Sequence, residues 1–220
     1  MLMILKAVIF DMDGVIVDSE PIWIASKQQM LKENGVEVPD SYHHRFFGTT
    51  LDYMWNAMKS EFDLPLTVEE CIGRGEEIRR GMLKASPPKE IKGAKEFIQQ
   101  LHQGGIPLAI ASSSSKANIQ QVTAELEIKE YFDVLVSSEE CERSKPFPDV
   151  FLKAAEDLGV FPAECLIIED AVNGVAAAKA AGSVCLGFAN PNFTRQDLSL
   201  ADGIFSDFAD LTLEKCSSYF

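Results

Sequence analysis

The sequence predicts an α/β protein, in which a doubly wound, Rossmann-like parallel sheet carries a separate, inserted α-helical cap domain. Short apolar runs alternate with helical patterns over the second half of the chain, which is typical of βαβ units. The long interval after the first apolar run contains only helical patterns. With 220 residues, 46% of them hydrophobic, the chain can form one sizeable core and a small second unit.

The predicted strands are buried on both faces, because their apolar runs are continuous rather than alternating. Four runs have this pattern and a fifth candidate follows them: Ala7–Phe10, Leu108–Ala111, Val134–Val136, Cys165–Ile168 and Ser183–Gly187. Helical patterns lie between the later runs, over Ala94–Gln103, Lys116–Leu126, Pro148–Leu158 and Val172–Ala181. Glycine follows three of these patterns and is expected to end the helices.

The interval between the first and second strands is too long for a single crossover helix. It contains amphipathic stretches near Ile22–Asn34, Leu51–Phe62, Thr67–Ile72 and Glu76–Ala85. We therefore expect a helical cap over residues 19–87, and a catalytic core formed by residues 1–18 together with 88–220. The turn Ser86-Pro87-Pro88 marks the return to the core, since proline cannot continue a helix.

Composition excludes several classes of partner. The formal net charge of -14 opposes binding to nucleic acid or to an anionic membrane surface. No apolar run approaches the ~18 residues of a membrane span. Five scattered cysteines without a C-x-x-C pair argue against a disulfide framework and a zinc site. The sequence predicts a cytoplasmic monomer or weak homo-oligomer whose partner is a small metabolite.

Carboxylates follow two of the predicted strands. Asp11 and Asp13 come after the first strand, and Glu169 and Asp170 come after the run that ends at Ile168. One aspartate there would be explained as a turn or helix cap. Carboxyl ends of parallel strands share one edge, however, and several carboxylates at one edge repel each other unless a cation lies between them. The sequence therefore predicts a Mg²⁺ site with these four residues as ligands.

A phosphate-binding site in so acidic a chain needs local positive charge. Lys145 lies in a loop between Ser144 and Pro146, where it can neutralise a phosphoryl group. The alternative is an ordinary solvated lysine. Ser112 follows the second strand and begins a run of four serines, where hydroxyl and backbone N–H groups suit a phosphate. We predict Ser112 and Ser113 as phosphate ligands, and Ser114 or Ser115 as helix caps.

These motifs resemble, in order, the four motifs of the haloacid dehalogenase-like hydrolase superfamily. The segments that carry the resemblance are Asp11–Val15, Ser112, Lys145–Asp149 and Ile168–Asp170. The insert resembles the cap of the subgroup that contains β-phosphoglucomutase and small sugar-phosphate phosphatases. One Asp-x-Asp is a weak signal, whereas four motifs in order and in strand context are a specific one.

The resemblance implies a role for each motif residue. Asp11 would attack phosphorus and become a phospho-aspartate, and Asp13 would act as the general acid and base. Mg²⁺ would be held by Asp11, the backbone carbonyl of Asp13 and Asp170, with Glu169 as a direct or indirect partner. Ser112 and Lys145 would bind the phosphoryl oxygens. The implied activity is Mg²⁺-dependent hydrolysis of small phosphate monoesters such as sugar phosphates.

The cap residues leave alternatives open. Trp23 stands where the mutase has a histidine, and Phe47–Leu51 lacks the mutase's arginine. Arg74 aligns with a cap lysine of the mutase and could contact a substrate phosphate, or it could lie with Arg79 and Arg80 on a solvated helix face. We interpret His43 and His44 as surface residues. A phosphatase is therefore favoured over a phosphomutase, and a non-catalytic binding protein is the third hypothesis.

Overall fold

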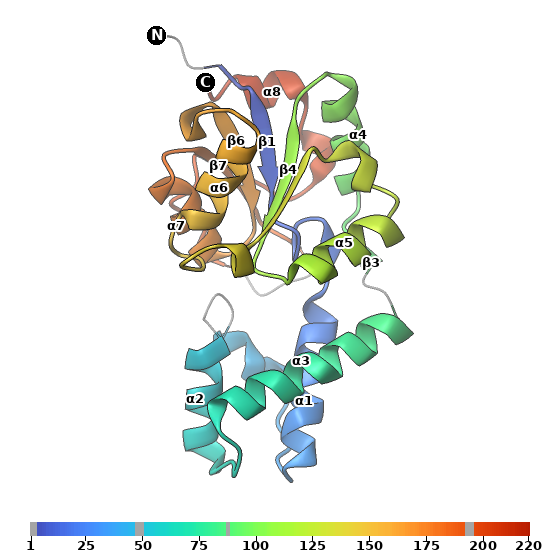
Figure 1. Ribbon diagram of the computed structural model, residues 1–220, viewed down its shortest axis with the longest axis vertical. Coiled ribbons are helices and arrows are strands. Elements are labelled where there is room, and N and C mark those ends of the chain that lie inside the picture. Colours follow the sequence, from blue (N-terminus) through green and yellow to red (C-terminus); the bar gives the residue numbers. More distant parts are fainter. Residues whose placement is uncertain (1–3, 47–50, 87–88, 192–195) are drawn as a thin grey trace. The chain divides into compact units, whose positions relative to one another are not determined.

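The computed structural model describes residues 4–46, 51–86, 89–191 and 196–220. The chain divides into two compact units: Met1–Asp18 with Lys89–Phe220, here called the core unit, and Ser19–Pro88, here called the cap unit. Figure 1 shows the elements of both units. Of the turn expected at Ser86-Pro87-Pro88, residues 87 and 88 lie outside the described residues, as does most of the cap segment 47–51.

Six parallel strands form the main sheet in the described part of the core unit, in the order β5-β4-β1-β6-β7-β8. Their bounds are β1 (Ala7–Phe10), β4 (Leu108–Ser112), β5 (Val134–Ser137), β6 (Cys165–Glu169), β7 (Val184–Phe188) and β8 (Gly203–Phe205). The predicted doubly wound α/β class is confirmed. The edge strand β8 was not predicted, because a three-residue strand that includes a glycine has no continuous apolar run.

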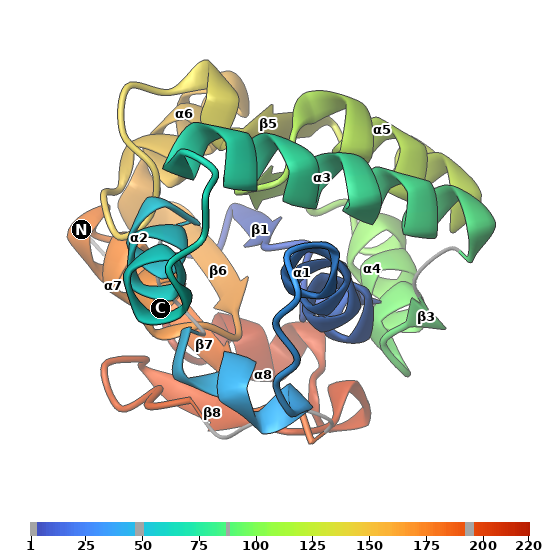
Figure 2. The ribbon, with the colours of Figure 1, turned by 90° about the horizontal axis from the view of Figure 1, so that it is seen from below.

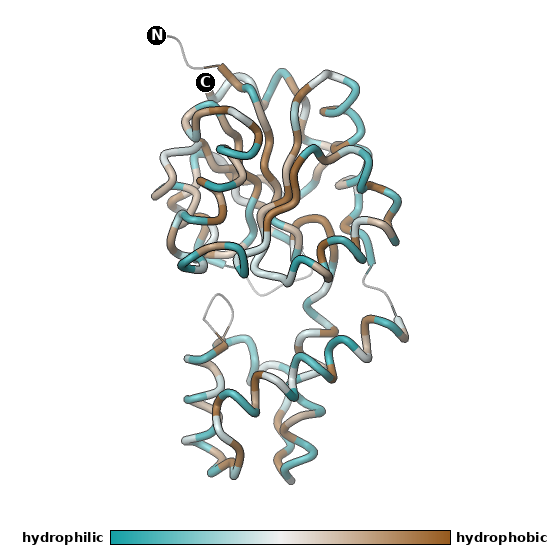
Figure 3. The backbone as a smooth tube through the Cα atoms, in the orientation of Figure 1, coloured by the Kyte–Doolittle hydropathy of each residue, from teal (hydrophilic) through white to brown (hydrophobic). Residues whose placement is uncertain are grey.

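Helices cover both faces of this sheet (Figures 1 and 2). Alternate residues of β1 point to opposite sides: Val8 and Phe10 join the cluster under α4, α5 and α8, and Ala7 and Ile9 join the cluster under α6 and α7. The bounds are α4 (Ala94–Gln103), α5 (Lys116–Glu125), α6 (Asp149–Asp157), α7 (Val172–Ala180) and α8 (Leu213–Ser217). Burial on both faces explains why the strands are hydrophobic throughout, as Figure 3 shows.

Short elements complete the core unit. Two of them, β2 (Val17–Asp18) and β3 (Lys89–Glu90), pair antiparallel where the chain leaves and re-enters this unit. The others are short 3₁₀ segments: η2 (Lys129–Tyr131), η3 (Ser138–Glu140), η4 (Pro162–Glu164) and η5 (Phe208–Asp210).

The cap unit is helical and has its own apolar core. Its elements are α1 (Glu20–Glu33), the 3₁₀ segment η1 (Asp40–Phe46), α2 (Leu51–Phe62) and α3 (Val68–Ala85). In Figure 2, α1 and α2 are seen end-on while α3 runs across them. Large buried side chains from all three helices and η1 fill the space between them, among them Met30, Phe46, Trp55 and Cys71. In the described residues, no helix is both long and apolar enough to cross a lipid bilayer.

The single helix α3 covers both of the helical stretches predicted near Thr67–Ile72 and Glu76–Ala85. The predicted break at Gly73-Arg74-Gly75 does not occur, and α3 continues through it. The low helix propensity of glycine does not end the helix here. Gly75 lies against the Trp55 ring, which a Cβ at that position would approach to 3.4 Å. A capping box between Thr67 and Glu70 begins the helix.

Candidate active site

The turn after β1 presents Asp11 and Asp13. The Asp11 N–H donates to the carbonyl of Ile168 on β6 at 2.9 Å, which ties the turn to the neighbouring strand. Gly14 has a φ of +83°, and a Cβ at that position would overlap the carboxylate of Asp170. Backbone conformation and space therefore both require glycine, and the close approach brings Asp170 against the aspartate turn.

Lys145 lies buried between two carboxylates. Its Nζ donates to Asp11 Oδ1 at 2.5 Å, to Glu169 Oε1 at 2.8 Å and to the carbonyl of Ala111 at 3.1 Å. These three acceptors satisfy the three protons of the ammonium. Burial alone would lower the pKa of Lys145, but the charges of Asp11 and Glu169 outweigh it and hold the pKa above its usual value. Lys145 is therefore a fixed cation and not a solvated lysine.

Negative charge exceeds positive charge at this edge of the sheet. The pKa of Asp11 is raised to about 8, chiefly by burial; the charge of Lys145 lowers it, and the charges of Glu169 and Asp13 add to the rise. Asp11 is therefore stabilised as a carboxylate by one lysine and destabilised by its burial and its acidic neighbours. An additional cation would remove that conflict.

Glu169 is directed at Lys145 by its own local contacts. Its Oε2 accepts a hydrogen bond from the Ala171 N–H at 2.9 Å, while Oε1 accepts from Lys145. A Cβ on Gly174, in the first turn of α7, would overlap the Glu169 carboxylate. Glu169 is almost completely buried. Glu169 thus holds the lysine, and its direct or indirect role toward a metal stays a prediction.

Two serines contact Asp13. Ser114 donates to Asp13 Oδ2 at 2.7 Å, and Ser112 reaches the same oxygen at 3.4 Å. The Ser114 N–H donates to Ser112 Oγ at 3.0 Å, which closes the loop after β4. Ser113 is exposed, and Ser115 is the N-cap of α5. The prediction of a cap thus holds for Ser115, whereas Ser114 contacts the proposed general acid and base.

The donor set at this edge suits Mg²⁺. This ion binds proteins through one or two carboxylates and keeps other positions for water and phosphate oxygens. Asp11 and Asp170, with the backbone carbonyl of Asp13, could supply such a set, and the buried, acidic surroundings that raise the pKa of Asp11 favour a cation there. In the described residues, no three Asp, Glu, His or Cys side chains already converge on one metal position.

Asn190 is a part of the site that sequence reasoning missed. It follows β7, is buried, and donates from Nδ2 to the Gly14 carbonyl at 3.0 Å. Its only sequence signal is its place after an apolar run, the same signal that pointed to the other site residues. A single asparagine there is equally typical of a turn.

Arg74 is engaged inside the cap unit. Its guanidinium donates to both oxygens of Glu33 at 2.8 Å and to Glu77 at 2.7 Å, so it links α3 to α1. A contact between Arg74 and substrate stays a prediction. The interpretation of Arg79 as a solvated residue is wrong, because its side chain is buried and donates to Glu76.

His43 was also predicted to be a surface residue, and this is wrong. The side chain is completely buried, and neither ring nitrogen has a hydrogen-bond partner among the described residues. It lies edge-on to the Tyr42 ring, with centroids 5.5 Å apart. The 3₁₀ segment η1 turns His43 inward, a geometry that polar sequence patterns do not reveal.

Comparison with known proteins confirms the resemblance seen in the motifs. The family model described as haloacid dehalogenase-like hydrolase matches residues 8–188. The bifunctional riboflavin kinase/FMN phosphatase of Arabidopsis thaliana is 33% identical over 213 residues, which is 96% of this chain and 55% of that protein. The chain thus spans about half of the length of that relative.

Two further matches cover most of both chains. Hexitol phosphatase B of Escherichia coli is 30% identical over 190 residues, 80% of this chain and 79% of that protein. A crystal structure of a hydrolase of this family from Deinococcus radiodurans R1, with bound phosphate and sodium, has a TM-score of 0.78 and 27% identity. That likeness covers 98% of this chain and 96% of the other.

Proposed function

We propose, because the chain belongs to the haloacid dehalogenase-like hydrolase family, that it is a Mg²⁺-dependent phosphatase of small phosphate monoesters that works through a phospho-aspartate. The observation that carries the proposal is the buried Lys145 bridging Asp11 and Glu169, with Asp13 two residues along the same turn. A nucleophile, a fixed cation and a second carboxylic acid at one sheet edge are the groups that phosphoryl transfer requires.

In the first step, a carboxylate oxygen of Asp11 attacks phosphorus and the bond between phosphorus and the ester oxygen breaks. Asp13 gives its proton to the leaving oxygen, so that the alcohol departs neutral. In the second step, water attacks the phosphorus of the phospho-aspartate while Asp13 takes a proton from it. The bond between Asp11 and phosphorus then breaks, which releases inorganic phosphate and restores both aspartates.

Charge at the phosphoryl group is balanced by Lys145, which is held in place by Glu169, and by the hydroxyl of Ser112. Asp11, Asp170 and the Asp13 carbonyl would hold Mg²⁺. When bound, the ion would supply positive charge next to the phosphoryl oxygens and relieve the repulsion among the carboxylates. Because burial and acidic neighbours raise the pKa of Asp11, this added positive charge would help to keep Asp11 ionised as a nucleophile.

Sugar phosphates and related polyol or ribityl phosphates are the proposed substrate class. The support is that the similar proteins reported above are a hexitol phosphatase and an FMN phosphatase. Both names describe esters of primary alcohols on polyhydroxylated chains. Such alcohols are poor leaving groups, so their hydrolysis depends on the proton from Asp13.

Phosphate release from a panel of esters, measured with Mg²⁺ and again with excess EDTA, tests this proposal. The panel holds sorbitol 6-phosphate, glucose 6-phosphate, FMN and p-nitrophenyl phosphate. We expect release only with Mg²⁺, and an Asp11→Asn variant slower by roughly 10⁴-fold or more. Asp157→Asn, which changes an aspartate paired with Lys153 on the surface, is the matched control. Turnover by Asp11→Asn, or release in EDTA, would overturn the proposal.

A phosphomutase would give a different result. Glucose 1-phosphate supplied with glucose 1,6-bisphosphate should yield inorganic phosphate here. Accumulation of glucose 6-phosphate without matching phosphate release would show that the protein is a phosphomutase and not a phosphatase.

A further inference from the structure

Ser114 has a single hydroxyl proton, and its surroundings direct that proton to Asp13. The Ser114 Oγ accepts a hydrogen bond from Asn118 Nδ2 at 3.1 Å and donates to Asp13 Oδ2 at 2.7 Å. An amide nitrogen can only donate, and Asp13 Oδ2 accepts both in the carboxylate and in the acid that carries its proton on Oδ1. The chain Asn118, Ser114, Asp13 therefore has one direction, and the shorter of the two serine contacts to Asp13 is the one from Ser114.

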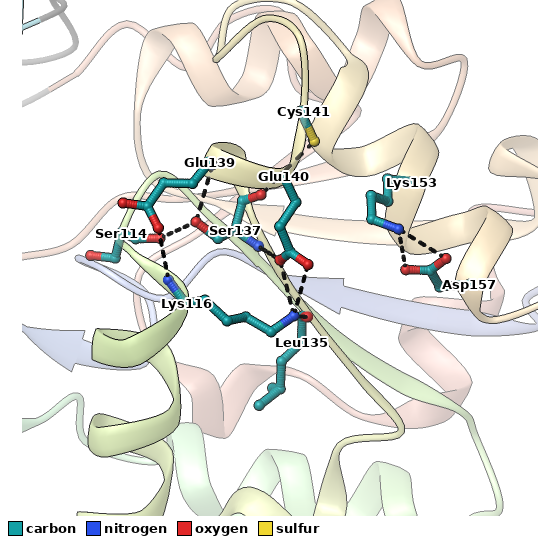
Figure 4. A network of polar contacts seen from close by, with 9 residues as sticks. All are labelled: Ser114, Lys116, Leu135, Ser137, Glu139, Glu140, Cys141, Lys153 and Asp157. Atoms are coloured by element: carbon teal, nitrogen blue, oxygen red, sulfur yellow. Dashed lines mark hydrogen bonds and ion pairs between the residues drawn. The ribbon is translucent and has the colours of Figure 1, made fainter.

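The backbone of Ser114 is held by the neighbouring strand. Ser137, the last residue of β5, is completely buried and donates from Oγ to the Ser114 carbonyl at 2.8 Å. The same Oγ accepts from the Glu139 N–H at 3.1 Å, and the Ser137 N–H donates to Glu140 Oε1 at 2.8 Å. Figure 4 shows these contacts, which fix the loop that carries Ser114.

A second contact from η3 fixes the start of α5. Lys116 donates to both oxygens of Glu140, at 2.9 and 3.2 Å, and to the carbonyl of Leu135. The Ser137 N–H and Lys116 both lower the pKa of Glu140, so this carboxylate stays charged and keeps the contact. The Ser114 carbonyl and the start of α5 are thus held by contacts with β5 and η3.

We propose that Ser114 is a positioning residue for Asp13. Its hydroxyl is oriented by Asn118 and lies on a backbone held by Ser137. This hydroxyl fixes the orientation of the Asp13 carboxyl group, which transfers the proton to the leaving oxygen. The inference rests on the proposed function and deepens it. Ser112 is left to contact the phosphoryl group, since its Oγ is 3.4 Å from Asp13 and accepts the Ser114 N–H. Ser112 thus contacts the phosphoryl group, whereas Ser114 orients the general acid Asp13.

A positioning role predicts a dependence on the leaving group. An alkoxide needs a proton to leave, whereas p-nitrophenolate does not, so only the alkyl ester depends on a well-placed Asp13. The measured quantity is the rate of phospho-enzyme formation in a single turnover, followed by rapid quench for sorbitol 6-phosphate and by the nitrophenol burst for p-nitrophenyl phosphate. Comparing the first step alone keeps the second use of Asp13, as a base, out of the measurement.

Ser114→Ala should slow phospho-enzyme formation about 10-fold or more from sorbitol 6-phosphate and less than about 3-fold from p-nitrophenyl phosphate. Ser114→Thr keeps the hydroxyl and should recover most of the loss. Adding Ser114→Ala to Asp13→Ala should cost nothing more, because the serine acts through the aspartate. Ser115→Ala removes the N-cap hydroxyl of the same helix and is the matched control, with an unchanged ratio of the two rates.

Equal slowing of both esters by Ser114→Ala, or a rise in KM with unchanged rates, would overturn the inference in favour of a structural or phosphate-binding serine. No slowing of either ester would overturn it as well. Each of these results leaves the phosphatase proposal standing, because the wild-type chain is active in all of them. A wild-type chain that hydrolyses no ester would instead overturn the proposed function, and the positioning role with it.

Discussion

Gly14 and Asp170 lie so close together that a Cβ at position 14 would fall inside the Asp170 carboxylate. The two residues are far apart in the chain and meet because β1 and β6 are neighbours in the sheet, with Phe10 opposite Ile168. The contact places the acidic end of β6 against the turn that holds Asp11 and Asp13. It is a direct, testable link between backbone conformation and the candidate site.

Gly14→Ala should therefore damage both stability and activity. A left-handed alanine costs about 1–2 kcal/mol, and displacement of Asp170 adds to it, for a total of about 2–4 kcal/mol by denaturant unfolding. Phosphate release should fall about 100-fold. Gly182→Ala is the control, because Gly182 has a φ of +81° with open space around it. Gly182→Ala should lose only the stability that a left-handed alanine costs, and it should keep full activity. A similar loss of activity in both variants would contradict the prediction.

Gly174→Ala should destabilise the protein, although alanine usually stabilises a helix relative to glycine. Replacing a helical glycine by alanine normally stabilises by about 0.5–1 kcal/mol. Here the new Cβ would meet the Glu169 carboxylate and push it from Lys145, so we expect a loss of about 1–3 kcal/mol and at least about 10-fold lower activity. Gly73→Ala, in α3 with nothing near its Cβ, should instead stabilise the protein. Thermal unfolding of both variants shows whether the signs differ as expected.

Lys145→Met should leave two carboxylates buried without their cation. Breaking a buried ion pair in this way costs about 3–5 kcal/mol, and loss of the charge at the phosphoryl group should lower turnover at least about 100-fold. Raising the Mg²⁺ concentration should recover part of the stability and little of the activity. Lys153→Met, which breaks the exposed pair with Asp157, should resemble the wild type. A Lys145→Met variant with turnover near that of the wild type would exclude the lysine from catalysis.

We expect the buried His43 to make the folded protein less stable in mild acid. Burial, and then the charge of Lys27, lower the pKa of His43 from 6.5 to about 4, while Asp40 opposes the change and His44 and Arg45 add to it. Between these two pH values the unfolded chain binds a proton that the folded chain does not, so stability falls as the pH drops from 6.5 towards 4.

After solvent screening we expect a loss of about 1–2 kcal/mol from this residue. His43→Phe should flatten the dependence of the unfolding free energy on pH in that window, and His44→Gln should leave it in place. An unchanged slope in His43→Phe would show that His43 titrates alike in the folded and unfolded states, and would contradict the prediction.

Local patterns were enough to predict five of the six described strands of the main sheet and the order of the site motifs. A strand buried on both faces must be apolar throughout, and the polar residue that ends it must lie at the carboxyl edge of the sheet. For this reason Asp11, Ser112 and Glu169 could be assigned to one edge from the sequence alone, and the parallel sheet that places them there is confirmed.

Other features depended on contacts between distant parts of the chain. Four identical serines in a row do not say which hydroxyl reaches Asp13; that is decided by how Ser137 on β5 holds the loop. Gly75 of α3 packs against the Trp55 ring of α2, a contact that the spacing of residues along the chain does not indicate.

The sequence by itself thus determined the α/β class and the chemistry collected at one sheet edge, since both follow from local hydrophobicity and strand ends. Only the tertiary structure decided which partner each of those groups has. The pairing of Lys145 with Glu169 and the contact of Ser114 with Asp13 join segments at the ends of separate strands. Packing sets such distances, and no spacing along the chain encodes them.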